Sequence, residues 1–306
     1  MAEHSPTPYD GSSSPFTIGL KPLDPANWID IDETYDAQMG EKRRLFDERL
    51  ADVLVAEDST GQAQQEVLEL LSAHLTGRFP ERFVLGGDGL AMARAGAAPP
   101  AGLSPLHRAS LLVQEDLILM RRDETGWRLA AGSLCFPSSW TLTEKFGLPI
   151  HQIHQPVPDF GEGSRNNELI GRMFDRLHQP VLRFNWSIQA SPALYHPMSD
   201  AGRDERSETR PSRFGSVDVR DAAFIRVERQ TLRRLPLSGA ILFTIRIYLD
   251  PLGRIGKDPD RARIARSLAG QLLAMSGDQL DYKGLTADRD RLVAALDAIA
   301  SRPFHG

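Results

Sequence analysis

The sequence of 306 residues contains one cysteine, Cys135. A single thiol excludes both an internal disulfide and a metal centre with four cysteine ligands within this chain. Apolar runs are short: Ile118–Met120 and Ala240–Phe243 fall far below the roughly 20 residues that a membrane span needs. The N-terminus has no basic start followed by an apolar stretch, so we expect no secretory signal and a reducing, cytoplasmic location.

Charge of one sign and nucleotide-binding loops are missing as well. The chain has 36 basic and 41 acidic residues with both signs interspersed, which argues against a generic nucleic-acid or anionic-membrane surface. The nearest approach to the dinucleotide fingerprint G-x-G-x-x-G is Gly161-Glu162-Gly163, which has Asn166 in the third glycine position. A P-loop and a G-x-S-x-G nucleophile elbow are also lacking. Electrons for any redox reaction must therefore come from elsewhere.

Hydrophobic periodicity predicts helices at both ends of the chain and strands between them. Residues 1–15 are rich in Ser, Pro and Gly, and we expect a disordered tail there. Helices are predicted over residues 36–57, 62–78, 139–146, 164–178, 258–275 and 287–301, and Ser164 is expected to be the N-cap of the fourth. Strands are predicted over residues 111–121, 127–136, 181–189, 222–232 and 240–249. The charged segment 203–213 is expected to be a solvated loop, and segment 151–160 an ordered one.

The order of these elements predicts an α+β fold. The first two strands and the last two are each joined by a hairpin-type connection containing glycine, so the sheet should be antiparallel. A helical insertion separates the second strand from the third, as in a PAS-like sheet. We therefore expect a five-stranded antiparallel PAS-like sheet flanked by N- and C-terminal helices, forming a single domain over residues 16–306.

Two histidines, His151 and His154, lie three residues apart in a segment that contains several prolines. Proline fixes φ and can hold an imidazole in the orientation that a metal requires. Three alternatives remain open: both histidines shape the loop by bonding to backbone carbonyls, one of them binds haem, or both join Asp159 in a non-haem facial triad. The spacing alone favours the first alternative.

Two predicted strands carry unusual polar residues. Alternation in segment 183–187 places Phe184 and Trp186 on one face, which suits either the core or a flat cofactor. In the segment around residues 224–232, Arg226, Glu228 and Gln230 share a face opposite to Arg229. At least one of these charged side chains should be buried and paired, either in a structural ion-pair network or in a pocket wall that binds an anion or oxygen. Cys135 is expected to be a buried, inert thiol rather than a haem ligand.

Taken together, these segments resemble the alpha subunits of haem-dependent oxidative N-demethylases. The resemblance spans about residues 20–300. It rests on 35–36 (Tyr-Asp), 40–42 (Gly-Glu-Lys), 134–140 (LCFPSSW), 144–147 (EKFG), 153–158 (IHQPVP), 183–187 (RFNWS), 226–236 (RVERQTLRRLP) and 243–246 (FTIR).

The resemblance implies a PAS-like domain that binds haem b and oxidises a small secondary amine such as dimethylamine with O2. It further implies partner subunits: an iron–sulfur flavoprotein reductase that supplies FMN, a 2Fe–2S cluster and electrons from NADPH, and a folate-handling subunit. Two alternatives stay open: a haem-based gas or redox sensor, and a non-catalytic PAS-like assembly subunit that has lost haem.

The resemblance also implies roles for individual residues. His154 occupies the histidine position of the Ile-His-x-Pro-Val-Pro motif and is expected to be the axial haem and metal ligand. Trp186 and Phe243 should contact the cofactor and close a tight cavity. The expected catalytic residues are Arg226, Glu228, Arg229 and Gln230. Of these, the arginines would hydrogen-bond to oxygen on the open side of the haem, and the other two would accept the N–H of the amine.

Overall fold

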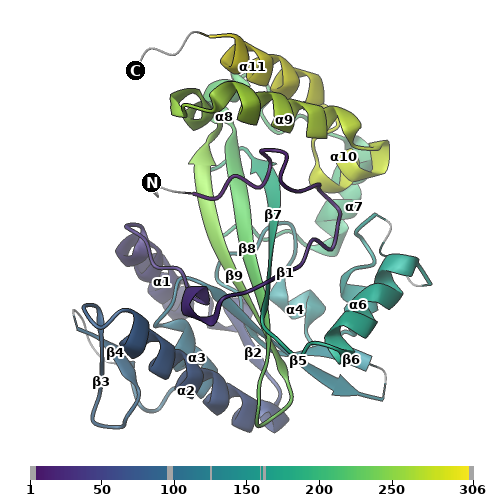
Figure 1. Ribbon diagram of the computed structural model, residues 1–306. Helices are drawn as coiled ribbons and strands as arrows, with labels where there is room; N and C mark the ends of the chain where they lie inside the picture. The colour runs from purple at the N-terminus through teal and green to yellow at the C-terminus, as the bar shows by residue number, and fades with distance from the viewer. Residues whose placement is uncertain (1–4, 95–98, 125, 159, 161–162, 303–306) are drawn as a thin grey trace.

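The computed structural model describes residues 5–94, 99–124, 126–158, 160 and 163–302, and Figure 1 shows their arrangement. The strands are β1 (Lys21–Pro22), β2 (Leu54–Ala56), β3 (Phe83–Leu85), β4 (Ala91–Ala93), β5 (Asp116–Asp123), β6 (Gly126–Ser133), β7 (Val181–Gln189), β8 (Phe224–Arg234) and β9 (Ile241–Pro251). The helices are α1 (Tyr35–Val53), α2 (Gly61–Arg78), α3 (Pro105–Ser110), α4 (Leu142–Lys145), α5 (Ile150–Ile153), α6 (Arg165–Asp175), α7 (Asp200–Thr209), α8 (Val219–Ala222), α9 (Arg261–Ala274), α10 (Gly277–Lys283) and α11 (Arg289–Ser301). None of the helices in these ranges has the length and apolarity to cross a membrane.

Seven strands of the described chain form one antiparallel sheet in the order β1-β7-β8-β9-β5-β6-β2. The mixed helix-and-sheet class is confirmed, but the strand number of five is wrong. The five predicted strands are the central ones, and two edge strands of two and three residues are added by β1 and β2. Such short segments carry too few residues for period-two alternation to be recognised. The PAS-like relationship and the single domain over residues 16–306 stay predictions.

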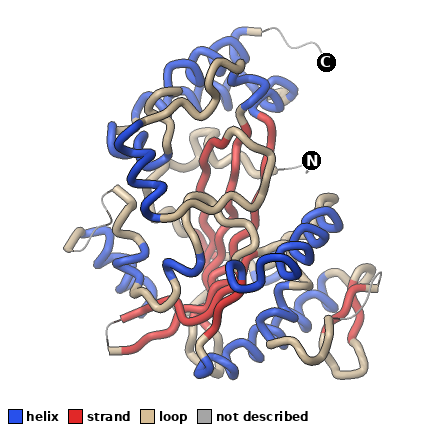
Figure 2. The backbone as a smooth tube through the Cα atoms, turned by 180° about the vertical axis from the view of Figure 1, so that it is seen from behind, coloured by secondary structure: helices blue, strands red, loops and turns tan. Residues whose placement is uncertain are grey.

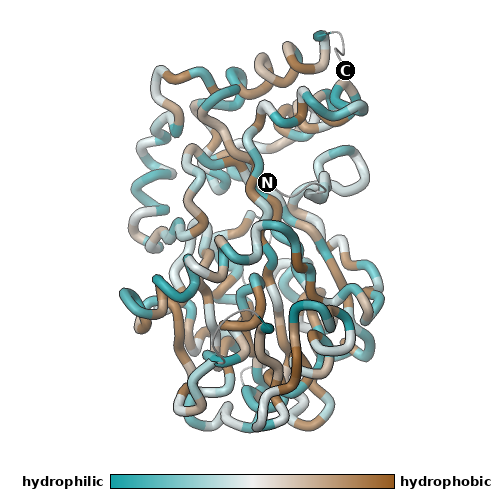
Figure 3. The backbone as a smooth tube through the Cα atoms, turned by 90° about the vertical axis from the view of Figure 1, so that its left-hand side faces the viewer, coloured by the Kyte–Doolittle hydropathy of each residue, from teal (hydrophilic) through white to brown (hydrophobic). Residues whose placement is uncertain are grey.

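Helices surround both ends of this sheet. In Figure 1, α9–α11 lie at one end of β7, β8 and β9, while α1–α3 lie toward the other end. Figure 2 shows the strands running through the middle of the molecule with helices around them, and hydrophobic stretches in Figure 3 follow the strands. One buried cluster joins α9–α11 to β7–β9, and a second joins α1–α3 to β5 and β9. A third cluster joins β5 and β6 to α4–α6, and the cavity described below lies beside it.

The N-terminal helix cap of α6 follows the sequence prediction. Ser164 accepts a hydrogen bond from the Asn167 backbone N–H at 3.2 Å, which satisfies one of the donors that a helix start leaves without a partner. The long helices expected over residues 36–57 and 62–78 are present as α1 and α2, although the first ends at Val53 and continues into β2.

Segment 203–213 is not a solvated loop, because its first half forms α7. Arg203 is only 7% exposed and pairs with Asp200, and Arg213 donates hydrogen bonds to the carbonyls of Lys283 (2.7 Å) and Gly284 (2.8 Å). Gly284 ends α10 at a positive φ of 62°, and a Cβ there would lie 2.6 Å from the Arg213 guanidinium. Arg203 thus has a partner within its own helix and Arg213 has partners about 70 residues away, and the composition of the segment reveals neither.

The segment expected as a disordered tail is described from residue 5 onward. Tyr9 is 5% exposed, and its ring centroid lies 6.4 Å from that of Trp186 at an interplanar angle of 75°. The Gln271 side chain of α9 donates to the Tyr9 carbonyl at 3.2 Å. These contacts place the start of the described chain against the C-terminal helices.

Arg246 on β9 fastens the segment before α1 to the sheet. Its fully buried guanidinium donates to Asp32 Oδ2 and Gln38 Oε1, at 2.7 and 2.8 Å. Although burial alone would raise the pKa of Asp32, Arg246 together with hydrogen bonds from Thr34 and Gln114 holds it below its usual value. Removing the arginine therefore leaves a half-buried carboxylate without its counter-charge.

We expect Arg246→Met to lower the free energy of unfolding by about 3 kcal/mol, because breaking a buried ion pair strands the remaining charge. The lowered pKa of Asp32 means that its contribution is complete above about pH 4 and is lost as the pH falls further. The difference in the free energy of unfolding between wild type and variant should consequently be smaller at acid pH than at pH 7. Urea denaturation at pH 7 and pH 3 measures both effects, with Arg172→Met on the exposed face of α6 as control. A variant as stable as the control at pH 7 would contradict this role.

Candidate functional site

A cavity of about 270 Å³ lies against the face of the sheet that carries Asn185 and Glu228. We call it the central cavity. Its walls come from β5–β9, the segment 134–160, α6, α7 and α10, together with residues near the N-terminal strand β1. Most of the lining is apolar, and examples are Ile118, Met120, Leu129, Ile170, Phe174, Leu232 and Phe243. Such walls exclude water and suit a flat, largely apolar ligand.

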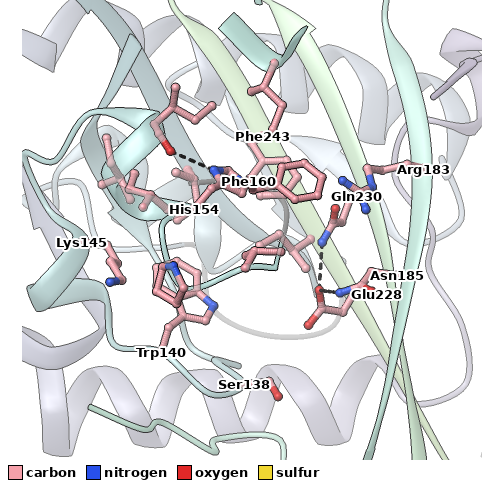
Figure 4. Close-up of a pocket in the computed structure, with 18 of the residues that line it drawn as sticks. Ser138, Trp140, Lys145, His154, Phe160, Arg183, Asn185, Glu228, Gln230 and Phe243 are labelled. Atoms are coloured by element: carbon pink, nitrogen blue, oxygen red, sulfur yellow. Dashed lines mark hydrogen bonds between the residues drawn. The ribbon is translucent and has the colours of Figure 1, made fainter. Parts of the chain in front are cut away.

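His154 lies in the wall of the central cavity directly after the short helix α5. Its Nδ1 lies 2.9 Å from the carbonyl oxygen of Ile150, and the dashed line at His154 in Figure 4 marks this hydrogen bond. A carbonyl oxygen only accepts, so Nδ1 carries the ring proton and Nε2 keeps its lone pair. Burial and the positive charge of Arg183 lower the pKa of His154, so the neutral form is favoured. A neutral imidazole with one nitrogen fixed by the backbone is the usual form of a metal ligand.

A polar cluster lies across the cavity from His154. In Figure 4, Asn185, Glu228 and Gln230 project from the strands on the side opposite the histidine. Glu228 Oε2 accepts hydrogen bonds from Gln230 Nε2 (2.8 Å) and Asn185 Nδ2 (3.4 Å). The β7–β8 register pairs Asn185 with Glu228 and Arg183 with Gln230, which explains why these side chains share one face.

Cationic side chains complete the lining. Lys145 and Arg203 are both buried, and both pair with Asp200 at the N-terminus of α7. Arg183 from β7 and Lys283 from α10 also line the cavity. An apolar cavity with several positive charges at its margin suits a ligand with apolar body and anionic substituents.

The structure brings together four of the residues selected from the sequence: His154, Phe243, Glu228 and Gln230 all line the central cavity. Arg226 lies beside them without forming part of the lining. It is 1% exposed and donates to the carbonyls of Phe136 and Leu194 and, through Nε, to Glu228 Oε1 at 3.4 Å. Its guanidinium therefore holds the Glu228 carboxylate in place from outside the cavity lining.

Arg229 and Trp186, which were expected to act in the site, lie outside the lining of the central cavity. Arg229 is on the opposite face of β8, where it donates to the backbone carbonyls of Asn27 and Trp28. The indole N–H of Trp186 donates to Gln271 at 3.1 Å, and the ring packs beneath the C-terminal helices. Period-two alternation separates both residues from the cavity, so it is the polar face of β7, and not its apolar face, that lines the site.

Sequence reasoning missed several lining residues. The signal for Arg183 and Asn185 was present, since alternation in segment 183–187 places both opposite Trp186. Lys145, Arg203, Tyr282 and Lys283 gave no such signal, because α4, α7 and α10 reach the cavity only through tertiary packing.

The other candidates from the sequence lie outside the central cavity or outside the described residues. His151 is not among the lining side chains, and Asp159 falls outside the described residues. No group of three or more His, Cys, Asp or Glu side chains in the described ranges could hold a metal ion. Cys135 is fully buried, and burial raises the pKa of its thiol to about 12, which keeps it protonated and unreactive.

Comparison with known families agrees with the resemblance seen in the sequence. The model of the family described as haem-dependent oxidative N-demethylase, alpha subunit-like, matches residues 19–293. This range runs from β1 into the first residues of α11 and hence includes every segment that lines the central cavity except the stretch around Phe16 and Ile18. The family's description is that of a haem-dependent oxidoreductase subunit, and the word subunit implies partner chains. The chain belongs to the haem-dependent oxidative N-demethylase alpha subunit-like family.

Proposed function

We propose that this protein binds haem b in the central cavity and oxidatively demethylates a small secondary amine, such as dimethylamine, with O2. The observation that carries the proposal is the arrangement of His154 and Glu228 across one apolar cavity. One side offers a metal ligand, and the other offers an acceptor for an amine. The family match supports haem dependence and the oxidoreductase class.

The residues present fit a haem group. His154 would hold the iron through Nε2, since its Nδ1 is committed to the Ile150 carbonyl. The apolar side chains of β5, β6 and α6 would contact the porphyrin faces and edges. When bound, haem supplies the activation of O2, a reaction that none of the side chains in the cavity can perform alone.

Glu228 would bind the substrate. A secondary amine is a cation at neutral pH, and a partly buried carboxylate attracts it strongly. Hydrogen bonds from Arg226, Asn185 and Gln230 fix the orientation of the carboxylate, yet its four lone-pair sites leave room for one further N–H donor. Glu228 can also accept the ammonium proton at one of its oxygens, which frees the nitrogen lone pair before oxidation.

Gln230 and Phe243 would shape the cavity around the amine. The Gln230 amide donates to Glu228, so its carbonyl oxygen remains able to accept from a substrate N–H. Phe243 is an apolar part of the wall that limits water near the nitrogen. Arg226 acts on the substrate only through Glu228, as a positioning residue.

Electrons would come from partner subunits. We propose a reductase with FMN and a 2Fe–2S cluster that takes electrons from NADPH, and a folate-handling subunit that removes the one-carbon product. The support for this division is the lack of dinucleotide and P-loop motifs in the sequence, its single cysteine and the subunit character of the family.

We expect His154→Ala to lose haem or to change its spectral class, because no other histidine lines the described wall of the cavity. His151→Ala should leave the spectrum nearly unchanged, since its side chain does not line the cavity. Absorption spectra of both variants after reconstitution with hemin decide the matter. If only the His151 variant loses the Soret band, the ligand assignment is wrong.

We expect Glu228→Gln to raise the KM for the amine about 10- to 100-fold, because it replaces a charge-assisted hydrogen bond with a neutral one. Turnover is measured with an artificial electron donor, so that the result does not depend on a partner subunit. Glu168→Gln, on the exposed face of α6, is the matched control. Equal KM values for the Glu228 variant and the control would remove Glu228 from substrate binding.

A further inference from the structure

Two cations that line the central cavity, the half-buried Arg183 and the buried Lys283, lack an acidic partner among the described residues. Neither Arg183 nor Lys283 forms an ion pair with a carboxylate in the described part of the chain. Lys145 and Arg203, by contrast, share Asp200. Burying a charge without a counter-charge is costly, so an uncompensated pair beside a cavity indicates that a ligand supplies the missing negative charge.

Arg183 keeps part of its guanidinium unused. Its Nη2 donates to the carbonyl of Thr17 at 3.2 Å, whereas its buried Nε has no hydrogen-bond partner among the described residues. Burial lowers the pKa of Arg183 below its usual value, and the negative charge of Glu228 offsets this only in part. A guanidinium offers five donors in a fork that matches a carboxylate, so this side chain can accept an anionic ligand.

Lys283 is in a similar position at the end of α10. Its Nζ donates to the carbonyl of Trp186 at 2.6 Å and lies over the rings of Phe16 and Trp186, 5.0 and 4.9 Å from their centroids. Burial lowers the pKa of Lys283 to about 8. An ammonium has three donors, and one backbone carbonyl leaves capacity for a carboxylate oxygen.

The nearest acid does not neutralise the two cations. Glu228 raises the pKa of both Arg183 and Lys283 through space, but its oxygens accept from Arg226, Asn185 and Gln230. Arg183 itself lowers the pKa of Lys283, because the two positive charges repel each other. Two anionic groups would relieve this repulsion better than one.

We propose that Arg183 and Lys283 form a carboxylate-binding subsite of the central cavity and that its ligands are the two propionates of haem. The inference rests on the proposed function, because it takes haem as the occupant of the cavity. It adds which side chains recognise the anionic edge of the cofactor: one from β7 and one from α10. A carboxylate of another small molecule could bind the same two cations. Hemin dimethyl ester, which keeps the porphyrin but lacks the propionate charges, shows whether the propionates are the groups that bind.

The test compares hemin with hemin dimethyl ester, in which both propionates are neutral. The full-length apoprotein is titrated with each compound, and the Soret band reports binding. We expect the wild type to bind hemin about 10- to 100-fold more tightly than the ester, the range for loss of charge-assisted hydrogen bonds. Arg183→Gln and Lys283→Met should each weaken hemin binding while leaving ester binding nearly unchanged. Arg172→Gln, on exposed α6, should behave as wild type.

The outcomes separate this inference from the function on which it rests. Hemin uptake by the wild type with equal affinity for the ester overturns the propionate subsite and leaves the haem proposal standing. Uptake of neither compound overturns both. The comparison of hemin with its ester on the wild type needs no substitution, so it tests the subsite even if a variant fails to fold. Thermal melting of the apoproteins shows whether each variant is folded.

Discussion

The register between β7 and β8 is the constraint on which the central cavity depends. Residues on a strand alternate between two faces, so a slip of one residue would exchange the cavity face for the helix-covered face. The observed pairing of Asn185 with Glu228 and of Arg183 with Gln230 puts the polar residues of both strands on the cavity side. The same pairing sends Trp186 and Arg229 to the opposite side, where they stabilise the packing of the chain termini.

The cavity combines groups that lower stability with groups that offset part of the loss. Glu228 has three donors around it, and Lys145 and Arg203 share one aspartate. Arg183 and Lys283 have no such compensation among the described residues. Functional sites commonly retain polar groups that a purely structural core would replace, and these two cations in the lining of the central cavity fit that pattern. A bound anionic cofactor would therefore stabilise the fold as well as equip it for chemistry.

The sequence predicted the regular elements best where periodicity is long. The limits of β7, Val181–Gln189, agree with the predicted strand, and Ser164 caps α6 as its side chain suggested. The edge strands β1 and β2 are too short to produce a pattern. In segment 203–213 the charged composition resembled a loop because some of its partners, such as the carbonyls at the end of α10 that Arg213 contacts, are distant in sequence. Within the site, alternation identifies residues of one strand, whereas Lys283 reaches the cavity only once the helices pack.

The central claim is that His154 and the apolar cavity opposite Glu228 hold one haem b. Reconstitution of the purified chain with hemin, followed by removal of unbound hemin and assay of the pyridine haemochrome, measures both the stoichiometry and the type of haem. The account predicts about one equivalent of haem b per chain together with a Soret band characteristic of histidine ligation. A colourless protein that retains no hemin after this treatment would contradict it.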